Sequence, residues 1–421
     1  MKVVWLCNTL IGEIADDYGL VLAKPESWIK AFYEQAKNDS HIDLVYLFPY
    51  KDELSFKIHN VSFISYPKAT SMKETLQIDF FRELIKKLKP DIIHIFGTEM
   101  VHSYNMTIAC SLEKCINTLV VSIQGLINIY AKHYYAFMPW KEITHNSFRD
   151  ICRNDTYFHG KHDFEFRGEY EKTIIKTANN VIGRTEWDEA CVKQINNNIK
   201  YHFCNESLRE SFYNSQKWDF NKCEKFSIFS SQSNYPIKGF HMLLEAMPEI
   251  LKKYPQAHLY TTGESPLKKG FKEKLKSTSY ANYLSRIIKR NNLEDKVTFL
   301  GYLDESAMCE RFLNSNVFIS PSSIENSPNS VGEAMILGVP TISSDVGGVK
   351  NMIKHGINGF LYPADENYMI QYYVDKIFSS PQKSSELSNN SIKSASIIHD
   401  KNVNYCTLIN IYHDILKTCR K

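Results

Sequence analysis

Short apolar runs alternate with longer amphipathic segments along the chain. In the first half, residues 3–7 (VVWLC) are apolar without interruption, and segment 73–90 has apolar residues at helical spacing and ends at Pro90. Apolar strands separated by helices predict a parallel sheet covered on both faces. The strands predicted in this half are residues 3–7, 42–48, 61–66, 91–96, 118–123 and 180–185.

A second series of strands and helices begins near Lys225. The segment 239–255 places Leu243, Met247 and Ile250 on one helical stripe, which is typical of a helix that covers a sheet. The polar, irregular stretch 206–224 separates the two series. The strands predicted in this half are residues 225–231, 258–263, 297–302, 316–322 and 341–346.

The fold class predicted is therefore α/β, with two Rossmann-like domains. We expect an N-terminal domain over residues 1–205, a hinge over 206–224 and a C-terminal domain over 225–395. A helix over 396–421 is expected to pack back on the N-terminal domain. Ligands of open parallel sheets bind beyond the carboxyl ends of the strands, which predicts a site in a cleft between the domains.

Composition narrows the class of protein. The formal net charge of +3 is too small to indicate nucleic-acid binding. The ten cysteines include no C-x-x-C pair, which favours reduced thiols in a cytoplasmic protein over a disulfide framework or a zinc site. No apolar run reaches the ~18–20 residues of a transmembrane helix, and the N-terminus lacks the features of a signal peptide.

Two glutamates bracket a short polar stretch, ENSPNSVGE, that follows the strand 316–322. We expect Glu325 in the loop and Glu333 near the third position of a helix over 331–337, capped by Asn329 or Ser330 and ended by Gly338 and Pro340. The first amides of that helix, from Asn329, Ser330 and Val331, would form a site for an anion or a hydroxyl. Without Glu325, a capping box with Ser330 would be the favoured role of Glu333; the two carboxylates together favour a ligand role.

This stretch is part of a longer pattern. The run 321–363 resembles the E-x7-E donor-site signature of the retaining glycosyltransferases of family 4 (glycosyl transferases group 1), among them bacterial surface-polysaccharide enzymes. Segments 235–255, 259–264 and 297–322 resemble further parts of the same donor-binding domain. Segments 90–99 and 120–126 resemble strand ends of the acceptor domain. The resemblance implies a GT-B fold, in which two Rossmann-like domains face each other across a deep cleft.

The resemblance also implies roles for individual residues. Glu333 would hold the ribose of a nucleotide-sugar, and Glu325 the transferred sugar. Lys238 would neutralise the diphosphate, so Glu325 and Lys238 are the catalytic candidates. The remaining donor-site candidates are Gly239, Gly263, Tyr302, Asn329, Ser330 and Val331; those on the acceptor side are Gly12, His94, Gln124, Gly125 and Arg184.

The sequence departs from the family pattern in three places, one of which is Asn326 in place of the common glycine after the first glutamate. No arginine precedes Lys238 in SSQSNYPIKG, and Arg184 is either its substitute or a structural arginine. Gln124-Gly125 replaces the usual His-Gly, which leaves His94, His102 and His133 as alternative proton carriers. No D-x-D pair occurs, so we expect neither a metal nor a cofactor. Lys238 and helix amides would then stabilise the leaving group in a front-face transfer.

Residues 129–170 are rich in aromatic side chains interleaved with Lys, Arg and His. Two interpretations stay open for this segment. It forms either a surface for the acceptor or a membrane interface, or an irregular insertion packed on its own aromatics.

The function predicted is a metal-independent, retaining hexosyltransferase. It would move a sugar from a UDP- or GDP-sugar to a glycan or polyprenyl-linked glycan in capsule, exopolysaccharide or O-antigen synthesis. A cytoplasmic location is expected, with peripheral contact to the inner membrane as an option and no nucleic-acid partner. The alternatives are a catalytically weak partner subunit, a GT-B nucleotide-sugar epimerase and a sugar phosphorylase.

Overall fold

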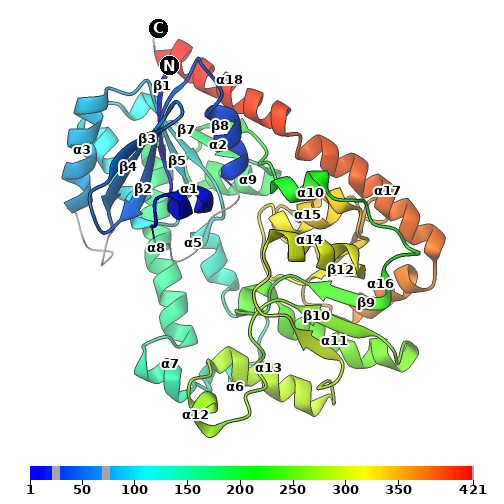
Figure 1. The fold of residues 1–421 in the computed structure, drawn as a ribbon. Helices are drawn as coiled ribbons and strands as arrows, with labels where there is room; N and C mark the ends of the chain where they lie inside the picture. Colours follow the sequence, from blue (N-terminus) through cyan, green and yellow to red (C-terminus); the bar gives the residue numbers. More distant parts are fainter. Residues whose placement is uncertain (21–28, 69–75, 420–421) are drawn as a thin grey trace. The chain divides into compact units, whose positions relative to one another are not determined.

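The computed structural model of the chain describes residues 1–20, 29–68 and 76–419. The chain divides into two compact units, each with its own parallel sheet (Figure 1). Unit 1 comprises Met1–Ile129, Phe164–Arg209 and His399–Lys421, and unit 2 comprises Tyr130–Asp163 and Glu210–Ile398.

Unit 1 is built on an eight-stranded sheet with the order β3-β4-β2-β1-β5-β6-β7-β8. The strands pair in parallel except at one edge, where β3 is antiparallel to β4. The central strands are buried on both faces, as their continuous apolar sequence predicts. Their bounds are β1 (Lys2–Leu6), β2 (Asp43–Tyr50), β3 (Ser55–Ile58), β4 (Val61–Pro67), β5 (Ile92–Phe96), β6 (Leu119–Ser122), β7 (Asn180–Gly183) and β8 (Lys200–Phe203).

Helices cover both faces of this sheet and form a separate apolar core on each. The C-terminal helix α18 packs into one of these cores through Leu408, Ile411, Tyr412 and Ile415, which are three or four residues apart. The helices of unit 1 are α1 (Gly12–Asp17), α2 (Lys30–Ala36), α3 (Leu76–Leu88), α4 (Val101–Leu112), α9 (Glu186–Ile195) and α18 (Lys401–Cys419). Two more, α5 (Ile127–Tyr130) and α8 (Tyr157–Thr177), have residues in both units.

Unit 2 is built on a six-stranded parallel sheet with the order β11-β10-β9-β12-β13-β14. Its strands are β9 (Glu224–Ser230), β10 (His258–Thr261), β11 (Val297–Phe299), β12 (Ser315–Ser320), β13 (Thr341–Ser344) and β14 (Phe360–Tyr362). The helices over 210–398 are α10 (Glu210–Asn214), α11 (Phe240–Lys253), α12 (Phe271–Leu275), α13 (Ser279–Arg290), α14 (Glu305–Leu313), α15 (Asn329–Leu337), α16 (Tyr368–Phe378) and α17 (Pro381–Ile398).

Segment 130–163 differs from the predicted division of the chain, which assigned it to the N-terminal domain. It folds with unit 2 and carries the short helices α6 (Trp140–Thr144) and α7 (Phe148–Cys152). Met138, Ile143 and Tyr157 join the apolar core of unit 2. The buried Asp150 accepts hydrogen bonds of 2.6 Å from both the backbone N–H and the hydroxyl of Ser279. These contacts join residues far apart in the chain, so the hydrophobic pattern of the sequence does not predict them.

The sequence pattern missed three strands, β3, β8 and β14. All are three or four residues long and lie at the edge of a sheet, and the side chains of β3 and β8 are partly exposed. Such strands carry too little apolar periodicity to be recognised.

Candidate functional site

The strand order places one topological switch point in each sheet. In unit 2 the chain moves from β9 to β10 and β11 on one side, then returns to β12 beside β9 and continues to β13 and β14. In unit 1 the equivalent neighbours are β1 and β5, because β2 and β4 lie on one side and β6 to β8 on the other. Ligands of doubly wound sheets bind outside the carboxyl ends of the two strands at this point.

The turn after β9 holds Lys238 at the switch point of unit 2. Pro236–Lys238 form a single 3₁₀ turn, and Gly239 follows with φ 69°, in the left-handed region. A Cβ atom on Gly239 would lie 1.8 Å from the carbonyl oxygen of Pro321, in the loop after β12. The same loop is tied to the turn by a 2.8 Å hydrogen bond from the Ser323 N–H to the Ile237 carbonyl. Glycine is therefore required here by the close approach of two backbone segments.

Lys238 and Glu325 form an ion pair between these two loops. Lys238 Nζ donates to Glu325 Oε1 at 2.6 Å, and the Ser322 hydroxyl donates to the same oxygen at 2.8 Å. The Glu325 side chain is 8% exposed and that of Lys238 21% exposed. Burial disfavours the charge on Lys238, but the Glu325 carboxylate, acting together with Tyr235 and Tyr130, outweighs that effect and raises the pKa of the lysine. Lys238 is thus held charged beside the carboxylate.

The backbone of Glu325 is fixed by residues that the sequence analysis did not single out. A Cβ atom on Gly347 (φ 50°) would lie 2.0 Å from the Glu325 carbonyl oxygen, and the Gly348 N–H donates to that oxygen at 3.1 Å. On the other side, the Asn326 N–H donates to the Tyr130 hydroxyl at 3.1 Å. The Gly347-Gly348 pair could have been recognised in the sequence, because adjacent glycines often mark a close approach between backbone segments.

Helix α15 begins two residues earlier than predicted. Pro328 is its N-cap and makes no side-chain cap, so Asn329 and Ser330 are helical residues and neither caps the helix. Glu333 accordingly lies in the second turn, and the predicted capping box with Ser330 is wrong. The Val331 N–H donates to the Pro328 carbonyl at 3.0 Å. It is therefore not available to bind a ligand, unlike the prediction for the first three amides of the helix. Gly338 ends the helix at φ 86°, as expected.

The remaining donor-site candidates also follow strand ends of unit 2. Gly263, after β10, has φ 103° and exchanges backbone hydrogen bonds with Gly301. A Cβ atom on Gly263 would lie 2.2 Å from Asn234 Oδ1, in the loop after β9. Tyr302, after β11, is 86% exposed. Glu333 is buried on α15, with 6% of the residue exposed.

His94, a predicted acceptor-side residue, lies in the core of unit 1. Its Nδ1 lies 2.6 Å from the Tyr412 hydroxyl on α18, and its Nε2 lies 2.7 Å from Ser122 Oγ on β6. Burial lowers the pKa of His94 to about 3, so the ring is neutral. With no exposed surface and both nitrogens hydrogen-bonded, His94 has the geometry of a structural histidine.

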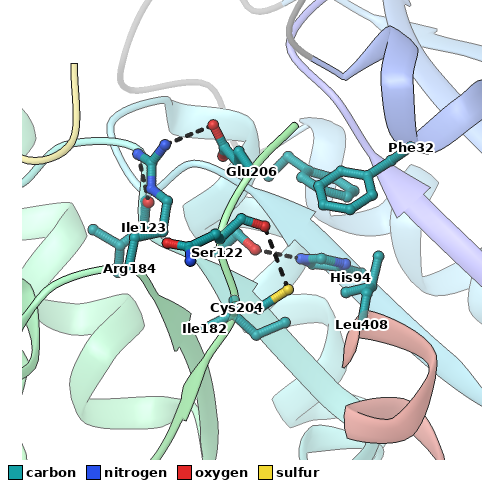
Figure 2. A pocket seen from close by; sticks show the side chains of 11 residues that line it. Phe32, His94, Ser122, Ile123, Ile182, Arg184, Cys204, Glu206 and Leu408 are labelled. Carbon is teal, nitrogen blue, oxygen red and sulfur yellow. Dashed lines mark hydrogen bonds and ion pairs between the residues drawn. The ribbon is translucent and has the colours of Figure 1, made fainter. Parts of the chain in front are cut away.

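Arg184 and Gln124 both bind Glu206 near the ends of β6 and β7, and Figure 2 shows the pair of Arg184 with Glu206. Arg184 Nη1 donates to Glu206 at 2.6 Å and Nη2 donates to the Gln124 carbonyl at 2.9 Å. The Gln124 amide donates to the other oxygen of Glu206 at 2.5 Å. The adjoining cavity is about 10 Å³, room for about one water molecule. This geometry favours the structural interpretation of Arg184 over the role of a phosphate ligand.

Gly12 and Gly125 lie after β1 and β6, the first as the opening residue of α1. Beside Gly125, the buried Glu171 of α8 accepts hydrogen bonds from the backbone N–H groups of Ile127 and Asn128 and from the Thr98 hydroxyl. This carboxylate holds the loops after β5 and β6 together. Within the described ranges, no cluster of three or more His, Cys, Asp or Glu side chains is placed to hold a metal ion.

Known glycosyltransferases are similar to parts of this chain. Over 157 residues the chain is 29% identical to an uncharacterised glycosyltransferase of Methanocaldococcus jannaschii, covering 37% of this chain and 36% of that protein. It is 25% identical over 144 residues to the phosphatidyl-myo-inositol mannosyltransferase of Mycobacterium leprae, covering 34% of each. These matches therefore span little more than a third of the relatives' length.

Solved structures match over the whole chain. Sucrose-phosphate synthase from Thermosynechococcus elongatus superimposes with a TM-score of 0.69 at 14% identity, covering 99% of this chain and 100% of that one. Anabaena HepE in complex with UDP superimposes with a TM-score of 0.68 at 16% identity, covering 98% and 100%. The two Rossmann-like units are those of the GT-B fold. Residues 212–394 match the family model described as Glycosyl transferases group 1.

Proposed function

We propose that the protein is a retaining glycosyltransferase that moves a hexose from a nucleotide-sugar to a glycan or lipid-linked glycan. The observation that carries the proposal is the Lys238–Glu325 ion pair at the switch point of a group 1 domain. The UDP complex of the fold relative HepE supports a uridine nucleotide as one donor class, beside the GDP-sugars.

Lys238 supplies the positive charge that the departing diphosphate needs. An ammonium group has three N–H donors, and Glu325 takes one of them. The other two can donate to phosphate oxygens, while Glu325 retains an oxygen for a hydroxyl of the transferred sugar. Since Arg184 binds Glu206, the diphosphate relies on Lys238 and on the N–H groups of Asn329 and Ser330 at the start of α15. No step in this account uses a metal or a cofactor.

Glu333 is assigned to the ribose, because a carboxylate accepts two hydrogen bonds from vicinal hydroxyls. We propose front-face transfer, in which the acceptor oxygen bonds to the anomeric carbon while the bond from that carbon to the phosphate oxygen breaks. The electron pair and the acceptor's proton both go to the leaving phosphate. The configuration of the anomeric carbon is thereby kept.

A polyprenyl-linked acceptor in surface-polysaccharide synthesis would bring this cytoplasmic protein to the inner membrane. Four large apolar side chains of segment 130–163 support such a contact, because they are at least half exposed: Phe137, Trp140, Phe148 and Ile151. Among the described helices, none is both long and apolar enough to cross a bilayer. Co-sedimentation with anionic vesicles should fall strongly in a Trp140→Ser/Phe148→Ser variant; unchanged co-sedimentation would contradict the contact.

The direct test is turnover by the purified chain. The protein is incubated with a panel of UDP- and GDP-sugars, with and without saccharide acceptors, and release of the nucleoside diphosphate is measured in EDTA. Hydrolysis of one donor by the wild type, and its loss in Lys238→Met, is the expected result. A chain that binds no donor and releases no diphosphate is not a glycosyltransferase by itself, and the partner-subunit alternative would then be preferred.

A further inference from the structure

A pocket of about 330 Å³ lies in unit 2 between α10, α14 and the segment that leads into β9. Figure 1 shows α10 and α14 next to α15, and the three helices pack on one another. One stripe of α14 forms a wall of the pocket, because Ser306, Cys309, Glu310 and Leu313 are three, four and seven positions along the helix. The volume is in the range of sites for small molecules, about 300–1,000 Å³.

The pocket lies away from the switch point of unit 2. Two of its lining residues, Lys222 and Asn314, come just before the amino ends of β9 and β12. Lys238 and Glu325 follow the carboxyl ends of the same two strands. The strands are seven and six residues long, so their two ends are roughly 20 Å apart. A ligand in the pocket therefore leaves the donor site open.

Contacts within unit 2 hold the walls of the pocket in place. The backbone N–H of Trp218 donates to the carbonyl of Leu337, the last residue of α15, at 2.8 Å. Its indole Nε1 donates to the Ser315 carbonyl at 2.7 Å. The Ser211 N–H donates at 2.9 Å to the side chain of Glu305, in the first turn of α14. The pocket is therefore formed by the protein's own hydrogen bonds before a ligand binds.

The charged groups of the lining balance one another. Two ammonium groups, of Lys217 and Lys222, line the pocket with two carboxylates, of Asp219 and Glu310. Within the part of the chain that the structure describes, no ion pair joins any two of these four groups. Burial lowers the pKa of Lys217, against a smaller opposing effect of the Cys309 thiol, which agrees with an ammonium group that lies partly inside the pocket.

The uncharged part of the lining combines hydrogen-bonding groups with an apolar wall. The Ser306 hydroxyl and the side-chain amides of Gln216 and Asn314 offer both donors and acceptors, and Trp218 and Leu313 are apolar. Each hydroxyl of a sugar donates and accepts, and the C–H faces of its ring pack on aromatic and aliphatic side chains. An anion such as phosphate would meet two carboxylates here, and a cation two ammonium groups. The lining therefore favours a neutral polyol over an ion.

We infer that this pocket is a second ligand site of unit 2 and binds a neutral saccharide. The inference goes beyond the proposed function and does not depend on it, because the site is defined by binding and not by transfer. In a glycosyltransferase, such a site would hold sugar units of a glycan that take no part in the reaction.

Saturation-transfer NMR of the full chain tests the site, with neutral gluco-, galacto- and manno-oligosaccharides of two to six sugars as probes. Saturating UDP and GDP are added, and the signal of the bound saccharide should persist. Ser306→Trp fills the pocket from an exposed position and should raise the Kd at least 10-fold. Glu310→Ala removes an exposed acceptor and should raise it about 10-fold. The matched control is Ser396→Trp, an exposed helical serine of α17 outside the pocket, which should bind as the wild type does.

Three results would overturn the inference: no signal from the wild type with any probe, equal Kd values for Ser306→Trp and Ser396→Trp, or binding of inorganic phosphate in the pocket without binding of a saccharide. Melting temperatures show whether each variant folds. Should Ser306→Trp not fold, Glu310→Ala decides, and an unchanged Kd in that variant would contradict the site.

The failure of this inference is distinguishable from that of the proposed function. A wild-type chain that binds a saccharide in the pocket but neither binds nor hydrolyses a nucleotide-sugar would contradict the proposed function alone. A chain that hydrolyses a nucleotide-sugar but binds saccharides equally well with and without Ser306→Trp would contradict the pocket alone.

Discussion

The switch points of the two units lie in sheets with corresponding strand orders, yet their side chains are partnered in opposite ways. At the switch point of unit 2, Lys238 and Glu325 neutralise each other, and Ser322 and Gly348 complete the hydrogen bonds of Glu325. At that of unit 1, one polar atom of each of Asn8, Glu99 and His102 is shielded from solvent and makes no hydrogen bond within the described part of the chain. An ion pair can organise one strand edge before a ligand binds, whereas the other edge keeps polar atoms whose hydrogen bonds are not made.

Lys238→Met should have the largest effect, because it removes the cation that pairs with Glu325 at the switch point of unit 2. Loss of one preorganised charge from the leaving group costs about 10²–10³ in turnover. Glu325 is left buried and unpaired, which should lower the free energy of unfolding by roughly 2–3 kcal/mol, less than for a fully buried pair. Diphosphate release and chemical denaturation measure the two effects. Turnover within fivefold of the wild type would contradict the role of the lysine, and Lys238→Arg is the control that keeps the charge.

Arg184→Met tests whether unit 1 uses its buried ion pair for structure. The variant leaves Glu206 buried without its cation, so the free energy of unfolding should fall by about 3 kcal/mol. Nucleotide affinity should stay within twofold, and Arg184→Met/Glu206→Leu should regain part of the stability. A tenfold weaker affinity for the nucleotide, with normal stability, would instead restore Arg184 as a ligand of the diphosphate.

Glu333→Ala should weaken binding of the nucleoside diphosphate about 10- to 100-fold, the effect of losing hydrogen bonds between a carboxylate and two ribose hydroxyls. Isothermal titration calorimetry with the nucleoside diphosphate, and with its 2′,3′-dideoxy form, measures the effect. The variant should bind both forms alike. If its affinity for the ordinary nucleotide matched that of the wild type, Glu333 would be a buried structural carboxylate.

Glu99 makes unit 1 respond to pH within the neutral range. Burial, and secondarily the neighbouring Glu171, raise the pKa of Glu99 to about 7, against the opposing effects of the backbone N–H groups of Thr98 and Glu99 and of Arg167. The folded state then binds more protons than the unfolded state between the ordinary pKa of a glutamate and about 7. Stability therefore falls as the pH rises through that range.

Glu99→Gln removes this titration. Relative to the variant, the wild type should lose about 1–2 kcal/mol of unfolding free energy between pH 5 and pH 8, less than the whole pKa shift because part of the residue is exposed. Chemical denaturation at several pH values measures this difference. A constant difference between the two proteins would show that Glu99 does not titrate in this range. His94 and His102 act in the opposite direction, since burial lowers their pKa to about 3 and stability is lost as the pH falls below about 6.5.

Sequence reasoning succeeded where structure depends on residues close together in the chain. The two α/β units and their parallel sheets followed from apolar runs separated by helices, and Glu325 and Glu333 followed from one short signature. The ion pair of Lys238 with Glu325 was not foreseen, because the partners lie 87 residues apart. The sequence also misplaced the start of α15, since a proline cap makes no side-chain hydrogen bond that marks the boundary.

The sequence by itself determined that two parallel sheets form, that Glu325 follows a strand end and that Glu333 lies on a helix, because strand periodicity and helix patterning are local properties of the chain. The tertiary structure alone decided that segment 130–163 folds with unit 2, that His94 is a core residue, and that Asn8 Oδ1, Glu99 Oε2 and His102 Nε2 make no hydrogen bond. Burial and hydrogen-bond satisfaction depend on side chains far apart in the sequence, so only the folded molecule defines them.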